Sequence, residues 1–171
     1  MNVSDLYVPP DLDEAAERWG ANCGPGALAA LTGRPLAQIL SYMPDFPERG
    51  YTNPTHAIRA LGQMGWNYDS GGEDFVGRGL AFVQWCGPWD HGTANARWAY
   101  RYTHWLAFSQ CGWDAIAVYD VNVEPAGGWC WYDQWAERVA PTLLPKRSTG
   151  HRIRKYISAW PEDSAAEGAE E

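Results

Sequence analysis

The hydrophobic periodicity of this chain changes once along its length, and that change limits the folds open to it. Up to Gly65, apolar residues recur at the three-to-four-residue spacing of helices, with a break at Gly33 and Pro35. After residue 75 the pattern becomes short aromatic and β-branched runs, which are typical of strands. Helices that precede strands, rather than alternate with them, predict an α+β fold in which helices pack on an antiparallel sheet.

The expected elements follow from this pattern and from the Gly and Pro residues that bound it. Helices are predicted over residues 14–19, from Gly24 or Pro25 to Thr32, over 36–43, from Pro54 to Gly65, and over 131–144. Strands are predicted over 80–86, 101–109, 115–121 and 151–160, with the second and third joined by a hairpin centred near Gly112. Residues 1–160 then form one domain with 1–13 as an extended lead, and the acidic stretch 161–171 is expected to be a disordered tail.

The formal charge of -8 is concentrated at the two ends of the chain. Residues 1–17 hold five acids and no base, and residues 162–171 hold five more acids. The middle therefore carries about +2, which is too little for a nucleic-acid binding track. A small basic cluster is interpreted as a solvated strand edge, with a phosphate or an acidic partner as the alternative; it consists of Lys146, Arg147, Arg152, Arg154 and Lys155.

The four cysteines show neither a CxxC spacing nor a Cys/His metal pattern. No apolar run approaches 18 residues, and the N-terminus lacks the basic and apolar regions of a signal peptide. We therefore expect free thiols in a reducing cytoplasmic setting, with no metal, cofactor or membrane partner.

The segment Asn22-Cys23-Gly24-Pro25-Gly26 places one cysteine at the start of a short apolar helix. The unsatisfied N–H groups and the positive dipole end of a helix at that position favour a thiolate. A thiolate is the form in which cysteine acts as a nucleophile at neutral pH. For a cysteine considered alone, the alternative is a small buried hydrophobe beside a turn.

A candidate base and a candidate orienting acid lie on the predicted hairpin. His104 is inside one strand, and a hairpin centred near Gly112 places Asp120 opposite it, with Cβ atoms about 5 Å apart on one face. Such a carboxylate can set the imidazole tautomer and stabilise its charged form. Each residue has a structural alternative, a core histidine or a strand-end acid, but the pair together with Cys23 indicates a Cys-His-Asp set. His91, in a turn-rich stretch, is the second choice for the base.

These residues resemble a known family. The segments Asn22-Cys23-Gly24-Pro25, Thr103-His104-Trp105 and Tyr119-Asp120-Val121, with the helical stretch ending Ala60-Leu61-Gly62-Gln63-Met64-Gly65, are similar to papain-like cysteine peptidases. Within them the chain is most similar to the bacteriocin-processing family C39 and its C39-like relatives, and it also resembles small uncharacterised phage-encoded proteins of this fold. The resemblance covers residues 19 to about 122. It implies a papain-like fold, a peptide or protein substrate, Cys23 as nucleophile, His104 as general acid/base and Asp120 as orienter.

One departure from the family pattern concerns the oxyanion hole. The family usually has a glutamine a few residues before the cysteine, whereas this chain reads Glu17-Arg18-Trp19-Gly20-Ala21-Asn22. The Cys23 backbone N–H remains, and the side chain of Asn22 or the indole of Trp19 is the candidate for the second donor. Loss of one such donor typically costs about 10²–10³ in rate.

The aromatic residues of the middle of the chain either line a substrate cleft or pack in the core. Trp89, Trp105 and His91 are the candidates for substrate binding, and Trp89 is expected to be exposed. The set as a whole predicts a thiol-dependent hydrolase of an amide or acyl bond (peptidase, isopeptidase or deamidase), ahead of acyl transfer. The alternative is a papain-fold binding protein, such as a phage-borne inhibitor of a host factor, which the missing glutamine favours.

Overall fold

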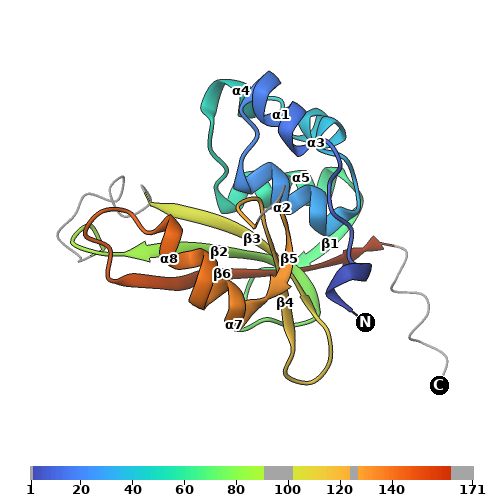
Figure 1. Ribbon diagram of the computed structural model, residues 1–171. Helices are drawn as coiled ribbons and strands as arrows, with labels where there is room; N and C mark the ends of the chain where they lie inside the picture. The colour runs from blue at the N-terminus through green and yellow to red at the C-terminus, as the bar shows by residue number, and fades with distance from the viewer. Residues whose placement is uncertain (1, 91–101, 124–126, 163–171) are drawn as a thin grey trace, which may run out of the picture.

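A layer of helices covers one face of a six-stranded antiparallel sheet in the computed structural model, which describes residues 2–90, 102–123 and 127–162 (Figure 1). The helical half comprises η1 (Val3–Asp5), α1 (Leu12–Trp19), α2 (Cys23–Thr32), α3 (Leu36–Tyr42), α4 (Phe46–Arg49) and α5 (Pro54–Gln63). The strands are β1 (Trp66–Asp69), β2 (Arg78–Cys86), β3 (Thr103–Gln110), β4 (Ile116–Asp120), β5 (Gly128–Trp131) and β6 (Gly150–Pro161). Between β5 and β6 lie α7 (Tyr132–Gln134), the π-helical turn η2 (Trp135–Val139) and α8 (Ala140–Leu143). The predicted α+β class is confirmed.

The sheet carries a separate hydrophobic core on each face, because alternate residues of its strands point in opposite directions. Leu80, Phe82, Trp105 and Ala107 pack against the N-terminal helices. Their strand neighbours, among them Ala81, Val83, Leu106 and Phe108, pack on the other face with η2 and α8. The strand order is β1-β6-β2-β3-β4-β5, so β3 and β4 lie next to each other.

The β3–β4 hairpin differs from the predicted register by two residues. Ala107 pairs with Tyr119, and the Cys111 N–H donates to the Ala115 carbonyl at 2.7 Å, so the turn is centred on Trp113. The register therefore places Asp120 beside Leu106 rather than directly opposite His104. A slip of two residues keeps every side chain on its original face, so His104 and Asp120 still share one face as diagonal neighbours.

Helix α2 lies against the sheet unusually closely because it is built from small residues. A Cβ atom added at Gly26 would lie 2.4 Å from Val121 Cγ1, and one added at Gly24 would lie 2.2 Å from Thr52 Oγ1. Asn22 caps the helix: its side-chain oxygen accepts from the Gly24 N–H at 3.3 Å. The close approach brings the first turn of α2 to the end of β4, where Asp120 lies.

Four elements were not expected from the sequence, namely η1, in the lead predicted to be extended, and α4, β1 and β5. The strands β1 and β5 have four residues each, and β1 is formed by pairing with β6, about ninety residues further along the chain. Trp131, predicted to begin a helix, is the last residue of β5, and the helical segment that follows is divided by a π-helical turn. Such elements depend on tertiary pairing and leave no local periodicity.

Candidate active site

Cys23 is the first residue of α2 and is half-buried at the margin of the helical core. The N–H groups of the first helical turn have no partner within the helix and point toward the N-terminal end. Its Sγ lies 4.0 Å from Asn22 Oδ1. The structure therefore places this thiol at the start of a helix, as the sequence predicted.

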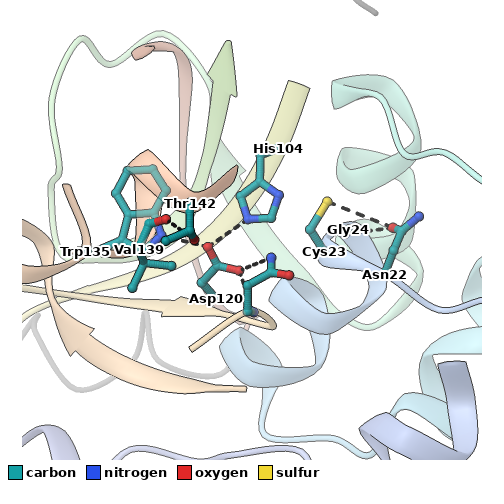
Figure 2. Close-up of polar contacts among 9 residues, drawn as sticks. Asn22, Cys23, Gly24, His104, Asp120, Trp135, Val139 and Thr142 are labelled. Carbon is teal, nitrogen blue, oxygen red and sulfur yellow. Dashed lines mark hydrogen bonds and ion pairs between the residues drawn. The ribbon is translucent and has the colours of Figure 1, made fainter. Parts of the chain in front are cut away.

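His104 and Asp120 come from adjacent antiparallel strands and meet at one end of the sheet. His104 is the second residue of β3 and Asp120 the last of β4. His104 Nε2 lies 2.9 Å from Asp120 Oδ2, and the two side chains are 9% and 0% exposed. The contact has the length of an ion pair, but the N–H direction departs from a well-aligned hydrogen bond. In Figure 2 the His104 ring lies between the Asp120 carboxylate and the Cys23 sulfur.

The Asp120 carboxylate is fully buried and is held by three hydrogen bonds and by its ion-pair contact with His104. Oδ1 accepts from the Asn122 backbone N–H at 2.9 Å and from its side-chain amide at 2.8 Å. Oδ2 accepts from Trp135 Nε1 at 2.7 Å and faces His104. Burial by itself would raise the pKa of Asp120, but His104, the Asn122 N–H and the Trp135 indole outweigh it and lower that pKa. The carboxylate is therefore charged at neutral pH.

The electrostatic surroundings of His104 favour its protonated form. Burial alone would lower the pKa of the imidazole, but the neighbouring Cys23 sulfur and the Asp120 carboxylate together raise it to about 10. Trp85 stacks against the imidazole with ring centroids 6.0 Å apart, and Trp135 stacks on Trp85 in turn. This aromatic layer fixes the ring plane and keeps water from the His104–Asp120 contact.

The Asn22 side chain links α2 to the segment before α5. Its amide nitrogen donates to the Gly50 carbonyl at 3.1 Å, and its oxygen faces the Gly24 N–H and the Cys23 sulfur. In this orientation the amide donor points to Gly50 and not to the sulfur, contrary to the role predicted for it in an oxyanion hole. The geometry makes the side chain a helix cap, since its oxygen serves the start of α2 while its nitrogen holds the end of α4 beside it.

The tryptophans proposed for the site have other surroundings. Trp19 ends α1 and packs edge-on against Phe46, with centroids 5.8 Å apart. Trp105 was expected to line a cleft, but its ring is 3% exposed and its Nε1 donates to the Thr52 carbonyl at 2.9 Å. Its side chain points to the helical face, where the core buries it.

Trp89 is half-buried rather than exposed. Its Nε1 donates to the Trp85 carbonyl at 2.7 Å, and its ring lies over Gly87 and against Tyr102. The ring is held by these contacts, which differs from the expectation of a free aromatic surface. His91, proposed as a substrate-binding residue and as an alternative base, lies outside the described residues.

Trp135 is a residue of the candidate site that sequence reasoning missed. It begins the π-helical turn η2, is completely buried, and donates to the same Asp120 oxygen that faces His104. Single-turn π-helices occur frequently at functional sites. In the sequence it is one of eleven tryptophans in a segment with an ordinary helical pattern, so no local signal marked it.

Two arginines of the basic cluster make contacts with neighbouring polar side chains. Arg152 Nη2 lies 2.6 Å from Asp90 Oδ1, and Arg154 Nη1 donates to Gln84 Oε1 at 3.3 Å. Both arginines are on β6. These contacts are consistent with the interpretation of the cluster as a solvated strand surface.

Comparisons with known proteins give only distant likenesses. No protein-family model matches the chain, and no curated protein matches it either. Among solved structures, the peptidase domain of Streptococcus ComA, a bifunctional ABC transporter of a quorum-sensing pathway, has 13% identity and a TM-score of 0.46 over 91% of this chain and 98% of that chain. The peptidase domain of Streptococcus mutans ComA in complex with a small-molecule inhibitor has 13% identity and a TM-score of 0.41 over the same shares. A likeness at this level assigns neither family nor activity.

A membrane-spanning helix is not found within the described ranges, since none of their helices is both long and apolar enough.

Proposed function

We propose that this chain is a papain-like thiol hydrolase of an amide or acyl bond, with Cys23 as nucleophile, His104 as general acid/base and Asp120 as the residue that orients His104. The observation that carries the proposal is the position of the His104 ring between the Cys23 sulfur and a buried carboxylate that Asn122 and Trp135 hold by hydrogen bonds (Figure 2). A protonated imidazole beside a helix-start cysteine is the arrangement that stabilises a thiolate.

The reaction follows from these three groups. The Cys23 thiolate attacks the substrate carbonyl carbon, and the developing oxyanion is stabilised by the Cys23 backbone N–H, since the Gly24 N–H is taken by Asn22 Oδ1. The imidazolium of His104 gives its proton to the leaving amine as the C–N bond breaks, which leaves a thioester on Cys23. His104 then takes a proton from water, the hydroxide attacks the thioester, and a carboxylic acid leaves as the thiolate and the imidazolium are restored.

Peptide or protein is the substrate class that we propose, because a nucleophile at a sheet–helix junction is reached most easily by an extended chain. Hydrolysis is preferred to transfer since no acceptor site for an amine is evident among the described residues. A papain-fold binding protein is the second candidate, and the Asn22 orientation favours it, because the second oxyanion donor is then missing.

Selective alkylation of Cys23 tests the proposal. We expect iodoacetamide at pH 6 to modify Cys23 at least about tenfold faster than the other three cysteines, measured by mass spectrometry of tryptic peptides. Cys86 and Cys130 are suitable internal references, since burial and a nearby aspartate raise the pKa of both thiols, that of Cys130 to about 11. His104→Gln should lower the Cys23 rate by about tenfold or more, because the positive partner is lost.

The same experiment separates the two candidates. If Cys23 reacts no faster than the other thiols and Cys23→Ala retains the biological activity of the chain, the hydrolase proposal is wrong and the binding protein is favoured. If Cys23 is hyper-reactive and Cys23→Ser abolishes cleavage of a peptide library, the hydrolase is supported.

A further inference from the structure

A small hollow beside the start of α2 is lined by two arginines, a histidine and a tyrosine. Its walls are formed by polar and charged side chains, with two apolar ones beside them: Arg49, Arg59, His56, Tyr51 and Asp45, then Met43 and Phe46. It is a shallow depression that is open to solvent, and its roughly 210 Å³ of non-atom space includes solvent outside the walls. The proposed mechanism uses none of these residues.

The charge of this hollow is positive on a chain whose net charge is -8. Arg49 Nη2 and Arg59 Nη2 each lie 3.5 Å from the same oxygen of Asp45, Oδ2. Arg49 Nη1 lies 2.9 Å from His56 Nε2. Burial, followed by the two arginines, lowers the pKa of His56, so the imidazole is neutral and accepts from Arg49. Two guanidiniums and one carboxylate leave an excess of one positive charge.

The arrangement of the two arginines fits a carboxylate. A single carboxylate oxygen already bridges both guanidiniums, so their spacing matches that group. Each guanidinium has five N–H donors, and Asp45 and His56 engage only some of them. Tyr51, which is 55% exposed and packs on His56 with centroids 5.8 Å apart, offers an apolar wall for the methylenes that would carry the carboxylate.

The hollow is linked to the proposed nucleophile through a hydrogen bond made by the neighbouring residue. Gly50, between Arg49 and Tyr51, accepts the 3.1 Å hydrogen bond from Asn22 Nδ2, and Asn22 immediately precedes Cys23. The chain from α4 to α5 runs beside α2 (Figure 1), and Thr52 contacts Gly24. An extended peptide advances roughly 3.3 Å per residue, so a side chain a few residues from a carbonyl at Cys23 can reach the arginines.

We propose that this hollow is a substrate subsite that binds a carboxylate a few residues from the bond attacked by Cys23. The carboxylate belongs to a Glu or Asp side chain or to the C-terminus of a peptide. The subsite rests on the proposed function, because it places an acidic residue relative to that bond. Its excess of one positive charge suits one carboxylate, which Arg49 and Arg59 bind from the solvent side while Asp45 holds the two guanidiniums together.

Matched electrophilic peptides test the subsite on the full chain. Chloroacetyl-Gly-Glu-Gly-amide and the peptide ketone acetyl-Gly-Glu-Gly-chloromethane extend from Cys23 in opposite directions, and each has a Gln counterpart. We expect the Glu form of at least one pair to label Cys23 about tenfold faster than the Gln form at neutral pH and low salt, measured by intact mass. The ratio of the Glu to the Gln labelling rate should fall toward one in the variants Arg59→Gln and Arg49→Gln.

Two controls fix the interpretation. Arg18→Gln removes an exposed arginine that pairs with Glu14 on α1 and does not line the hollow, so it should leave the ratio unchanged. A Gln peptide with a free C-terminal carboxylate that labels as fast as the Glu peptide would assign the carboxylate to a chain terminus. Selective labelling of Cys23 with equal Glu and Gln rates would overturn the subsite and leave the proposed function standing.

A binding measurement judges the subsite even if Cys23 proves unreactive, which would overturn the proposed function alone. The side-chain Nε–H resonances of Arg49 and Arg59 in the ¹⁵N-labelled chain are followed as acetyl-Gly-Glu-Gly-amide or its Gln counterpart is added. The subsite is supported if only the Glu peptide shifts these resonances and if the shifts are absent in the Arg59→Gln variant. If neither peptide shifts these resonances, the subsite is wrong.

Discussion

At the scale of single residues, the candidate site depends on one carboxylate oxygen. Asp120 Oδ2 accepts from the Trp135 indole at 2.7 Å and faces His104 Nε2 at 2.9 Å, inside a region with no exposure to water. A buried charge is tolerated only when its hydrogen-bonding capacity is met. Trp135 therefore serves His104 indirectly, by keeping the carboxylate ionised and in place.

Trp135→Phe should destabilise the protein in a pH-dependent way. The hydrogen bond to the charged oxygen is worth about 1.5–3 kcal/mol, and it helps to lower the pKa of Asp120 below the ordinary aspartate value of 3.8. A lowered carboxyl pKa contributes stability that is present above pH 3.8 and is lost as the pH falls further. We therefore expect the loss in the free energy of unfolding to be full at pH 6 and smaller at pH 3, measured by urea titration.

Trp129→Phe is the matched control, because Trp129 Nε1 donates to the neutral Tyr7 carbonyl at 2.8 Å. The free energy of unfolding that Trp129→Phe loses should be the same at pH 6 and pH 3. If the loss for Trp135→Phe is equally independent of pH, Trp135 contributes through packing and not through the charge of Asp120.

At the scale of secondary-structure elements, the site depends on how closely α2 approaches β4. Gly26 leaves room for Val121, the residue after Asp120, and this contact sets the distance between the first turn of α2 and the end of β4. Among glycines of the described helices, Gly62 in α5 provides a contrast, since an added Cβ there would meet nothing within 4 Å.

Gly26→Ala should destabilise the protein, because its new Cβ would lie 2.4 Å from Val121 Cγ1. Overpacking of this kind costs about 1–3 kcal/mol, which exceeds the helix-propensity gain of roughly 1 kcal/mol. Val121→Ala in the same chain removes the clashing methyl. The double variant should therefore be more stable than the sum of the single changes predicts, by about 1 kcal/mol in the free energy of unfolding.

Gly62→Ala is the control for helix propensity and should stabilise the protein by up to about 1 kcal/mol. If the changes in the free energy of unfolding for Gly26→Ala and Val121→Ala simply add in the double variant, the close contact does not exist in solution.

At the scale of the whole molecule, the site joins the helical layer to the sheet through charge. Cys23 belongs to the helical layer, whereas His104 and Asp120 belong to the sheet (Figure 2). The pKa of His104 is raised to about 10 from 6.5, so the folded protein keeps a proton that the unfolded chain loses. The stability that this group contributes is fully present below pH 6.5 and is lost as the pH rises toward 10.

We expect the stability difference between the wild-type chain and His104→Gln to shrink as the pH rises from 6.5 to 9. One titrating group can change the free energy of unfolding by at most about 1.4 kcal/mol per pH unit, and urea titrations at pH 6, 7.5 and 9 will measure it. His151→Gln is the opposite control: burial lowers the pKa of His151, so its contribution is lost as the pH falls. A pH-independent difference for His104→Gln would contradict the charged state assigned to this residue.

Local patterns were sufficient where a residue's role depends on its near neighbours. The helix start at Cys23, the α+β order and the shared face of His104 and Asp120 follow from capping chemistry and from the two-residue strand period. The predicted hairpin centre was wrong by one residue, which shifts the register by two residues. A shift of two keeps His104 and Asp120 on the same face of the sheet, so the predicted pair still meets.

The sequence by itself determined which residues are candidates for the chemistry, because helix caps and strand alternation are local properties of the chain. Tertiary structure decided the surroundings of those residues. Trp135 reaches Asp120 from a π-helical turn, Asn22 turns its amide to Gly50, Trp105 is buried under the helices, and Arg59 joins the local Arg49–Asp45 pair. These contacts are fixed by packing between segments that are separated along the chain, which leaves no periodicity in the sequence.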